Sequence, residues 1–189
     1  QLGSIEGDYK GVRQGTGVAD NRYSTHSQTT ITTGSKIIVM SAAEVWFLRA
    51  EAALRGYTSE DVENCYKQGI TVSFSQWDAN GVSDYLESEE TPAAYVDAFD
   101  KKFDADAPTS ITPKWDESAT PEQKLERIIT QKWLALYPEG CEAWAEQRRT
   151  GYPQLIKVAV NNSGNTISTD DMIRRVFFNQ DYKTDNKAL

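Results

Sequence analysis

The fold is decided by the stretch SAAEVWFLRAEAALRGYTSEDVENCYKQGITVSFSQW, residues 41–77. Its first half carries the start and stop signals of one helix. Ser41 followed by Glu44 is a capping box, which satisfies free backbone N–H groups at a helix start, and Gly56 is the kind of residue that ends a helix. Between these signals, apolar residues recur at helical spacing: Ala43, Phe47, Ala50 and Leu54.

The second half of the stretch predicts a second helix that packs against the first. We expect Thr58 with Asp61 to cap this helix, and we expect it to run to about residue 77. Its large apolar side chains form one stripe: Val62, Tyr66, Ile70, Phe74 and Trp77. A short link makes the two helices antiparallel neighbours, and the alanines of the first helix allow close approach. The unit is therefore predicted to be a helical hairpin of the tetratricopeptide kind.

A third helix is predicted to start at Thr120. This residue supplies the cap, Pro121 occupies the first helical position, and Gln123 stands at the third. The core stripe of the helix consists of Leu125, Ile129, Trp133 and Leu136. Because Leu134 and Tyr137 lie on another face, we expect the C-terminal end of this helix to be buried nearly all round.

A fourth helix is predicted in EGCEAWAEQRRTGYP, residues 139–153, with an abrupt end enforced by Gly151 and Pro153. Acids stand in its first turn, and Arg148 and Arg149 stand in its last turn, as the helix dipole favours. Arg148 lies one turn beyond Trp144 and is expected to cover its ring, whereas Arg149 is expected to reach Glu146. The two arginines therefore have different predicted contacts.

Taken together, these patterns predict an all-α fold, a tetratricopeptide-like helical hairpin scaffold with long irregular loops. Residues 1–37 are predicted to be an irregular N-terminal segment, and residues 38–189 a helical domain that is a fragment of a longer protein. Residues 78–119 interleave acids with aromatics and are expected to form a long loop, with one short helix near 91–101. A long excursion of this kind in a helical protein is usually either functional or disordered.

Composition excludes several classes of function. The chain of 189 residues has 20 basic and 28 acidic residues and a net charge of −8, so no nucleic-acid partner is expected. The apolar runs are too short to span a bilayer. Cys65 and Cys141 are both expected to be buried thiols, with a disulfide between them as the alternative. One histidine and two cysteines do not suggest a metal site, and no cofactor is expected.

The fourth predicted helix could also be read as a catalytic site. Glu139 and Glu142, or Glu142 and Glu146, would then be an acid/base pair for glycoside hydrolysis. Acids on one helix lean in the same direction instead of facing each other across a cleft, and nothing would raise one pKa selectively. Cys141 has no adjacent base, because His26 lies in the N-terminal segment. A capped, packed helix is the preferred interpretation.

Several stretches resemble the C-terminal part of the SusD/RagB family, in its SusD-like lipoprotein branch. They are SAAEVWFLRAEAALRGY, YKQGITVSFSQW, IITQKWLALYPEGCEAWAEQRRTGYP and the ending RRVFFNQDYKTDN. The resemblance covers roughly residues 38 to 186, and its structural motif consists of Trp133, Trp144, Arg148, Arg149, Gly151 and Pro153. The chain departs from the family pattern at Cys141, at Asn179, where proline is usual, and at Asp181, near the place of a glutamate.

The resemblance implies a protein on the outer face of a Gram-negative outer membrane, held by a lipid anchor that is absent from this chain. Such a protein captures an oligosaccharide or polysaccharide and covers a SusC-like TonB-dependent transporter that imports it. The implied function is non-catalytic glycan binding. One alternative is a structural interaction module that docks on the transporter without touching sugar, and a third possibility is a glycoside hydrolase.

Sugar recognition needs a flat aromatic face with polar groups beside it. Within residues 78–119, Trp115 is the leading candidate for such a platform, with Tyr85 and Tyr95 behind it. The alternative role for Trp115 is to anchor a loop to the scaffold. The four remaining tryptophans lie on helical stripes and are expected in the core: Trp46, Trp77, Trp133 and Trp144.

Overall fold

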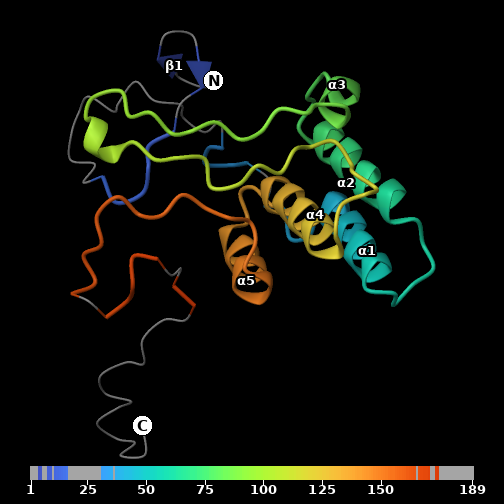
Figure 1. Ribbon diagram of the computed structural model, residues 1–189. Helices are drawn as coiled ribbons and strands as arrows, with labels where there is room; N and C mark the ends of the chain where they lie inside the picture. The colour runs from blue at the N-terminus through green and yellow to red at the C-terminus, as the bar shows by residue number, and fades with distance from the viewer. Residues whose placement is uncertain are drawn as a thin grey trace, which may run out of the picture.

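The protein is described by a computed structural model that covers residues 4–5, 8–9, 11–16, 31–35, 37–164, 166–170 and 173–174. Helices build its core, which confirms the all-α prediction (Figure 1). Two short strands, β1 (Ser4–Ile5) and β2 (Asp8–Tyr9), pair antiparallel, with Ser4 opposite Tyr9. The five α-helices within the described residues are α1 (Ala42–Leu54), α2 (Val62–Gln76), α3 (Val82–Leu86), α4 (Pro121–Ala135) and α5 (Gly140–Thr150). His26, Asn179 and Asp181 lie outside the described residues.

Helices α1 and α2 form the predicted hairpin. The Ser41 side chain accepts a hydrogen bond from the Glu44 backbone N–H at 3.0 Å, and Gly56 follows the helix with a φ of 74°. Helix α2 is capped by Asp61, whose carboxylate accepts from the Asn64 N–H at 2.6 Å. The prediction that Thr58 shares this role is wrong, because α2 begins at Val62, directly after Asp61.

The hairpin closes around a glycine. Gly69 on α2 lies against the ring of Phe47 on α1, where a Cβ atom would come within 2.7 Å of the ring. Helix α4 packs onto this pair, mainly against α1. The resulting core consists of Ala43, Phe47, Ala50, Cys65, Tyr66, Ile70, Trp115, Leu125, Ile128, Ile129 and Ala135. Two of the three helices, α2 and α4, lie beside each other and run in the same direction (Figure 1).

The caps predicted for the last two helices are confirmed. Thr120 and Gln123 exchange hydrogen bonds in a capping box, with Pro121 as the first helical residue. Helix α5 ends at Gly151, whose φ of 81° lies in the left-handed region that glycine favours. The Arg148 guanidinium lies 4.5 Å above the Trp144 ring, and Arg149 donates to Glu146 at 2.7 Å, both as predicted.

Residues 78–119 differ from the prediction in two places. No α-helix forms over 91–101, where the described chain is irregular up to a 3-10 turn, η2 (Lys101–Phe103). Helix α3, which the sequence analysis missed, occupies Val82–Leu86 instead. Its first turn follows Gly81, which has a φ of 85° and makes no side-chain cap, so no capping residue marks its start.

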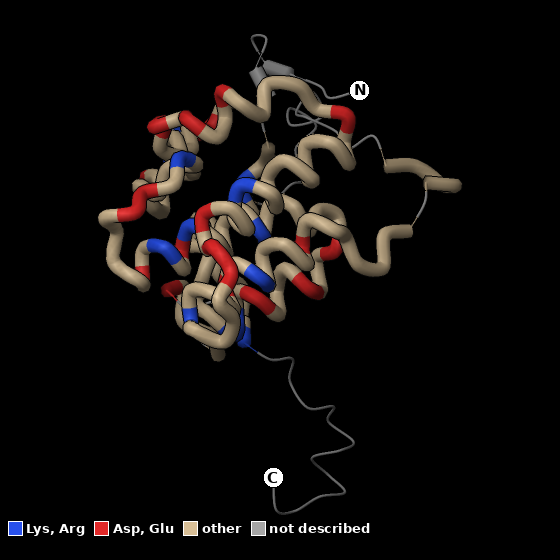
Figure 2. The backbone as a smooth tube through the Cα atoms, turned by 90° about the vertical axis from the view of Figure 1, so that its right-hand side faces the viewer, with Lys and Arg blue, Asp and Glu red and all other residues tan. Residues whose placement is uncertain are grey.

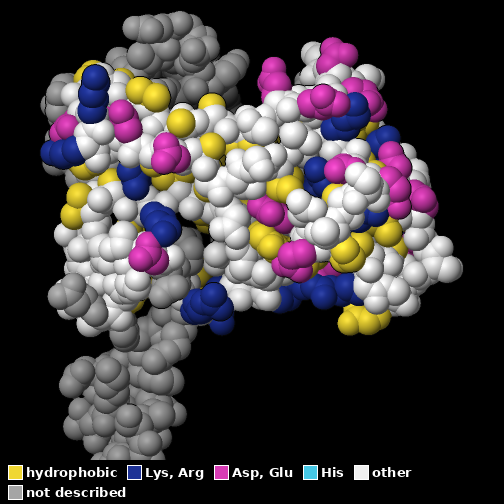
Figure 3. Space-filling model, viewed as in Figure 1, with side chains coloured by type: hydrophobic (Ala, Val, Ile, Leu, Met, Phe, Trp, Pro, Cys, Tyr) yellow, Lys and Arg dark blue, Asp and Glu magenta, His cyan; other side chains and the backbone are white. Residues whose placement is uncertain are grey.

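Three expectations about burial are also wrong. Trp77 is 41% exposed, and Leu134 and Tyr137 at the end of α4 are 49% and 50% exposed. The rings of Trp77 and Tyr137 meet each other at the surface, although the stripe assigned Trp77 to the core. Cys65 is buried as expected but Cys141 is exposed, and both are free thiols. On the face shown in Figure 3, hydrophobic side chains reach the surface in small groups between polar and charged ones.

Candidate functional site

Trp115, the leading sequence candidate, is packed into the core. It is 7% exposed, its ring centroid lies 5.1 Å from that of Tyr66, and its indole N–H donates to Glu117 at 2.8 Å. The preceding residues are tied to the helices, because the Tyr66 hydroxyl donates to the Pro113 carbonyl at 2.6 Å. Burial to this degree leaves almost no ring surface for a sugar. It favours the loop-anchoring role over stacking.

Tyr95 is half-buried in a loop of its own. Its hydroxyl donates to Asp97 at 3.0 Å and accepts from the Arg13 backbone N–H at 3.3 Å. Its backbone forms a bridge with Ala105. Burial raises the pKa of the Tyr95 hydroxyl, so it stays protonated and able to donate. Tyr95 does not line the hollow that Tyr85 lines, so the structure does not bring these two candidates together.

Tyr85 on α3 lies at a hollow of about 570 Å³, which we name the Tyr85 hollow. The rings of Tyr85 and Phe74 have centroids 5.2 Å apart and are inclined at 47°. The Tyr85 hydroxyl donates to Gln131 Oε1 on α4 at 3.0 Å, which fixes the ring between α2 and α4. The hollow is lined by Phe74, Asn80, Gly81, Asp84, Tyr85, Ser88, Glu89 and Glu90.

The rim of the Tyr85 hollow is polar and mainly acidic. Lys114 Nζ donates to Glu89 at 2.7 Å, and its backbone N–H donates to the Ser88 carbonyl at 3.1 Å. The hydrogen bond from Lys114 lowers the pKa of Glu89, which therefore stays ionised at neutral pH. Asn80 and Asp84 are exposed and offer an amide and a carboxylate. Aromatic rings beside planar polar groups are the chemistry that a sugar needs.

A smaller hollow of about 220 Å³ adjoins the first and shares Phe74 and Tyr85 with it. Its remaining lining residues come from α1, α2 and α4: Phe47, Ile70, Ser73, Gln131, Leu134 and Ala135. The two hollows meet at the Phe74 and Tyr85 side chains, near the C-terminal ends of α2 and α4.

Another hollow, of about 530 Å³, lies beside Trp144. The Trp144 indole N–H donates to the Ile173 carbonyl at 2.6 Å, and Arg148 covers the ring. The Asn161 amide in its wall already donates to Ile167 and Thr169 within the same loop. Trp144 is the aromatic residue that lines this hollow, whereas Phe74 and Tyr85 both line the Tyr85 hollow, so the Tyr85 hollow is the better candidate site.

The described residues also bear on three other features: a nucleic-acid surface, a metal site and a membrane-spanning helix. In the described residues, basic and acidic positions are interspersed without a continuous basic stripe (Figure 2). The same part of the chain holds no group of three or more His, Cys, Asp or Glu placed to bind a metal ion. Its helices include none with the length and apolar character needed to cross a membrane.

A model of the SusD-like family, described as SusD and RagB outer membrane lipoprotein, matches residues 2–189. The chain belongs to the SusD-like family. The match includes the Tyr85 hollow and the helices that hold it. No curated protein sequence matches the chain.

Solved SusD-like structures share this fold. A chitin-binding SusD homologue from Flavobacterium johnsoniae is 39% identical with a TM-score of 0.87, over 100% of this chain and 40% of its own. A SusD homologue from Bacteroides vulgatus is 44% identical with a TM-score of 0.86, over 98% of this chain and 40% of its own. A SusD homologue from Bacteroides thetaiotaomicron is 37% identical with a TM-score of 0.86, over 95% of this chain and 38% of its own. The chain therefore spans about two fifths of the length of these relatives.

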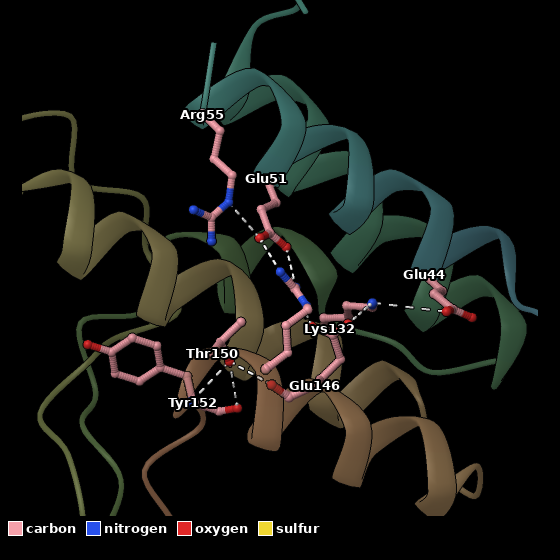
Figure 4. Close-up of polar contacts among 8 residues, drawn as sticks. Glu44, Glu51, Arg55, Lys132, Glu146, Thr150 and Tyr152 are labelled. Atoms are coloured by element: carbon pink, nitrogen blue, oxygen red, sulfur yellow. Dashed lines mark hydrogen bonds and ion pairs between the residues drawn. The ribbon is translucent and has the colours of Figure 1, made fainter. Parts of the chain in front are cut away.

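In this SusD-like chain, Arg149 of the motif meets a cluster of charged side chains that joins α1, α4 and α5 and that we name the charge cluster (Figure 4). Glu51 on α1, Lys132 on α4 and Glu146 on α5 are each no more than 5% exposed. Lys132 Nζ lies 2.9 Å from Glu146 Oε1 in an ionic contact without hydrogen-bond alignment, and 4.0 Å from Glu44 Oε1. Arg149 donates to both oxygens of Glu51, at 2.6 and 2.5 Å.

This charge cluster joins three helices and opens onto no described hollow, which argues against an acid/base role for its glutamates. Glu146 is engaged by Lys132 and Arg149, while Glu142 is exposed and Glu139 precedes α5. At the end of α5, the Thr150 hydroxyl donates to the Glu146 carbonyl at 2.7 Å. The charge cluster of the SusD-like chain, with Arg149 as its motif residue, thus holds α5 on the hairpin.

Proposed function

We propose that this chain is part of a non-catalytic surface lipoprotein that captures glycans for import through a partner TonB-dependent outer-membrane transporter. Membership of the SusD-like family supports the proposal, because that family is described as outer membrane lipoproteins. The observation that carries the glycan assignment is the likeness to a chitin-binding homologue, which extends over the whole of this chain. Oligosaccharides of the chitin type are therefore the first ligands to test.

Within this chain, we assign binding to the Tyr85 hollow. Phe74 and Tyr85 give an apolar aromatic wall for the C–H face of a sugar ring. Asn80 and Asp84 on the rim are exposed and placed to hydrogen-bond to hydroxyl or acetamido groups. A binding surface needs no more than this combination.

The hollow does not support hydrolysis. A glycoside hydrolase needs one carboxylic acid held protonated by a raised pKa, opposite a second carboxylate. At this rim, the hydrogen bond from Lys114 lowers the pKa of Glu89. Burial raises the pKa of Glu44, but this side chain lies at the charge cluster beside Lys132 and lines neither hollow.

Calorimetric titration with chitin oligosaccharides tests the assignment. We expect Asn80→Ala and Asp84→Ala each to weaken binding about fivefold, because each removes one hydrogen bond of about 1 kcal/mol. Asn64→Ala, an exposed substitution in the first turn of α2, is the matched control and should bind as the parent does. Equal affinity for all four proteins would remove the hollow from consideration, and no binding of any glycan would sink the proposed function.

A second candidate function is a structural module that docks on the transporter without touching sugar. The observation that favours it is an apolar segment before α1, in which Ile37, Val39 and Met40 are 87%, 91% and 57% exposed. Co-purification with the transporter that a triple substitution to serine abolishes, together with no affinity for any glycan, would support this candidate over glycan capture.

A further inference from the structure

Trp77 and Tyr137 form an exposed aromatic pair that the functions above do not use. Their ring centroids lie 5.9 Å apart and the rings are inclined at 49°. Trp77 is 41% exposed and Tyr137 is 50% exposed. Trp77 caps the end of α2, and Tyr137 follows the end of α4. Because α2 and α4 run in the same direction, their C-terminal ends bring these two rings together.

The backbone holds Trp77 in a defined place. The N–H of Asp78 donates to the Ser75 carbonyl at 3.3 Å, and the N–H of Ala79 donates to the Phe74 carbonyl at 2.9 Å. These two bonds close a Schellman turn, in which Asp78 takes the left-handed position with a φ of 51°. On the other helix, the Tyr137 N–H donates to the Leu134 carbonyl at 3.3 Å. The pair is thus carried by two helix ends instead of a loose loop.

The pair continues the surface of the two hollows. Ser73 and Leu134 line the smaller hollow. Trp77 follows Ser73 by four residues and Tyr137 follows Leu134 by three, so each ring lies about one helical turn, roughly 5 Å, further along its helix. A surface therefore runs from the Tyr85 hollow through the smaller hollow to the aromatic pair.

The size of the patch decides what it could bind. A whole aromatic side chain offers about 150–250 Å², so two half-exposed rings offer roughly 200 Å² between them. A stable protein interface buries about 800 Å² on each partner. The patch is too small for such a partner, whereas one sugar ring is covered well by two inclined aromatic faces.

We propose that Trp77 and Tyr137 form a second sugar-stacking subsite, so that the surface takes an extended oligosaccharide instead of a single sugar ring. This inference rests on the proposed function, and it adds that affinity increases with chain length. The reducing or non-reducing end of a glycan bound in the Tyr85 hollow extends over the smaller hollow, and a later ring stacks on the pair.

Titrations with a chitin disaccharide and a chitin hexasaccharide test this subsite. Trp77→Ala should weaken hexasaccharide binding about five- to tenfold, which is the effect of losing one stacking contact. The affinity for the disaccharide should not change. Trp77→Tyr keeps a flat ring and should retain most of the affinity, whereas Trp77→Leu keeps only apolar bulk and should not. Tyr57→Ala, which removes a ring that is 77% exposed in the loop between α1 and α2, is the matched control.

The outcomes separate this inference from the proposed function. If Asn80→Ala weakens both ligands while Trp77→Ala and Tyr137→Ala weaken neither, the second subsite is wrong and the hollow stands. If no variant or ligand shows binding, both proposals fall. A change of molar mass in solution for Trp77→Ala, without any change in glycan affinity, would make the pair a contact between copies of the chain and would also overturn the subsite.

Discussion

Arg149 on α5 holds Glu51 on α1 with two hydrogen bonds, one to each carboxylate oxygen, at 2.6 and 2.5 Å. The Glu51 side chain is almost fully buried, and Arg55 donates to the same carboxylate at 2.8 Å. Arg149 also donates to Glu146 on its own helix. This two-point contact between residues far apart in the chain orients α5 on the hairpin, and its removal should be felt throughout the fold.

Glu51→Gln should lower the free energy of unfolding by about 2 kcal/mol at neutral pH, because it leaves two guanidinium groups beside a neutral amide. The value is smaller than for a fully buried pair, since the Arg149 side chain is 44% exposed. Urea denaturation measures the change. Glu60→Gln, which breaks the more exposed pair between Arg49 and Glu60, is the matched control and should change little. Equal losses in the two variants would contradict the special role of Glu51.

The effect of Glu51 should depend on pH. Burial alone would raise the pKa of Glu51, but hydrogen bonds from Arg149 and Arg55 outweigh it and bring the pKa below 4.5. The stability from Glu51 is thus present above pH 4.5 and is lost as the pH falls through the lower, folded-state pKa. The difference between the parent and Glu51→Gln should therefore shrink in acid.

Glu44 should show the opposite sign. Burial raises its pKa above 4.5 despite the nearby Lys132. The stability that protonated Glu44 contributes to the fold is present below pH 4.5 and is lost as the pH rises through the folded-state pKa. Glu44→Gln should therefore cost far less at neutral pH than Glu51→Gln, and denaturation curves from neutral pH to below 4.5 compare the two. A larger loss for Glu44→Gln would show that its ion pair with Lys132 outweighs burial.

Gly69→Ala should destabilise the protein by about 1–2 kcal/mol. A Cβ atom there would come within 2.7 Å of the buried Phe47 ring, and overpacking of this kind outweighs the roughly 1 kcal/mol that alanine gains in a helix. Gly140→Ala is the matched control, because α5 begins there and no atom lies within 4 Å of the added carbon. In thermal unfolding, the melting temperature of Gly69→Ala should be lower than that of the parent, and that of Gly140→Ala should be equal or higher.

Trp115→Ala should reduce stability by about 3–5 kcal/mol, as for other buried aromatics. Trp115→Phe, which keeps a ring against Tyr66, should fold and bind chitin oligosaccharides with the affinity of the parent. Calorimetry on folded Trp115→Phe separates the two predicted roles. A clear loss of affinity in this variant would restore Trp115 as a sugar platform.

Cys141 should react with a thiol reagent in the folded protein while Cys65 should not. Cys141 is exposed, whereas burial raises the pKa of the Cys65 thiol and disfavours the reactive thiolate. One thiol per chain should react in buffer and two should react in denaturant. Cys141→Ser should abolish the reaction in buffer. No reactive thiol in denaturant without reductant would indicate the disulfide instead.

The sequence predicted what is determined locally. Ser41, Thr120 and Gly151 mark helix ends because each acts on backbone groups within a few residues. The same holds for the contact of Arg148 with Trp144, which are one turn apart. Helix α3 was missed because a five-residue helix after Gly81 carries no capping side chain.

Contacts between distant segments could not be predicted in this way. A helical stripe shows which face of a helix is apolar but not whether a neighbour covers it, so Trp77 and Tyr137 were wrongly placed in the core. The loop aromatics presented the converse problem. Nothing near Trp115 in the sequence shows that the Tyr66 ring on α2 packs against it, and among the three candidates it is Tyr85 that lines a hollow in the described part of the chain.

The ring of Tyr85 also places the candidate site in a hierarchy of folding. Its hydroxyl bonds to Gln131, which lies 46 residues later on another helix, whereas α1 and α2 meet through a turn of a few residues. Closing the longer loop has the greater entropic cost, so we expect the hairpin to form from local contacts before the Tyr85 hollow is complete. The helical scaffold can therefore form before the hollow does. A defect confined to α3 would leave a folded protein that no longer binds glycan.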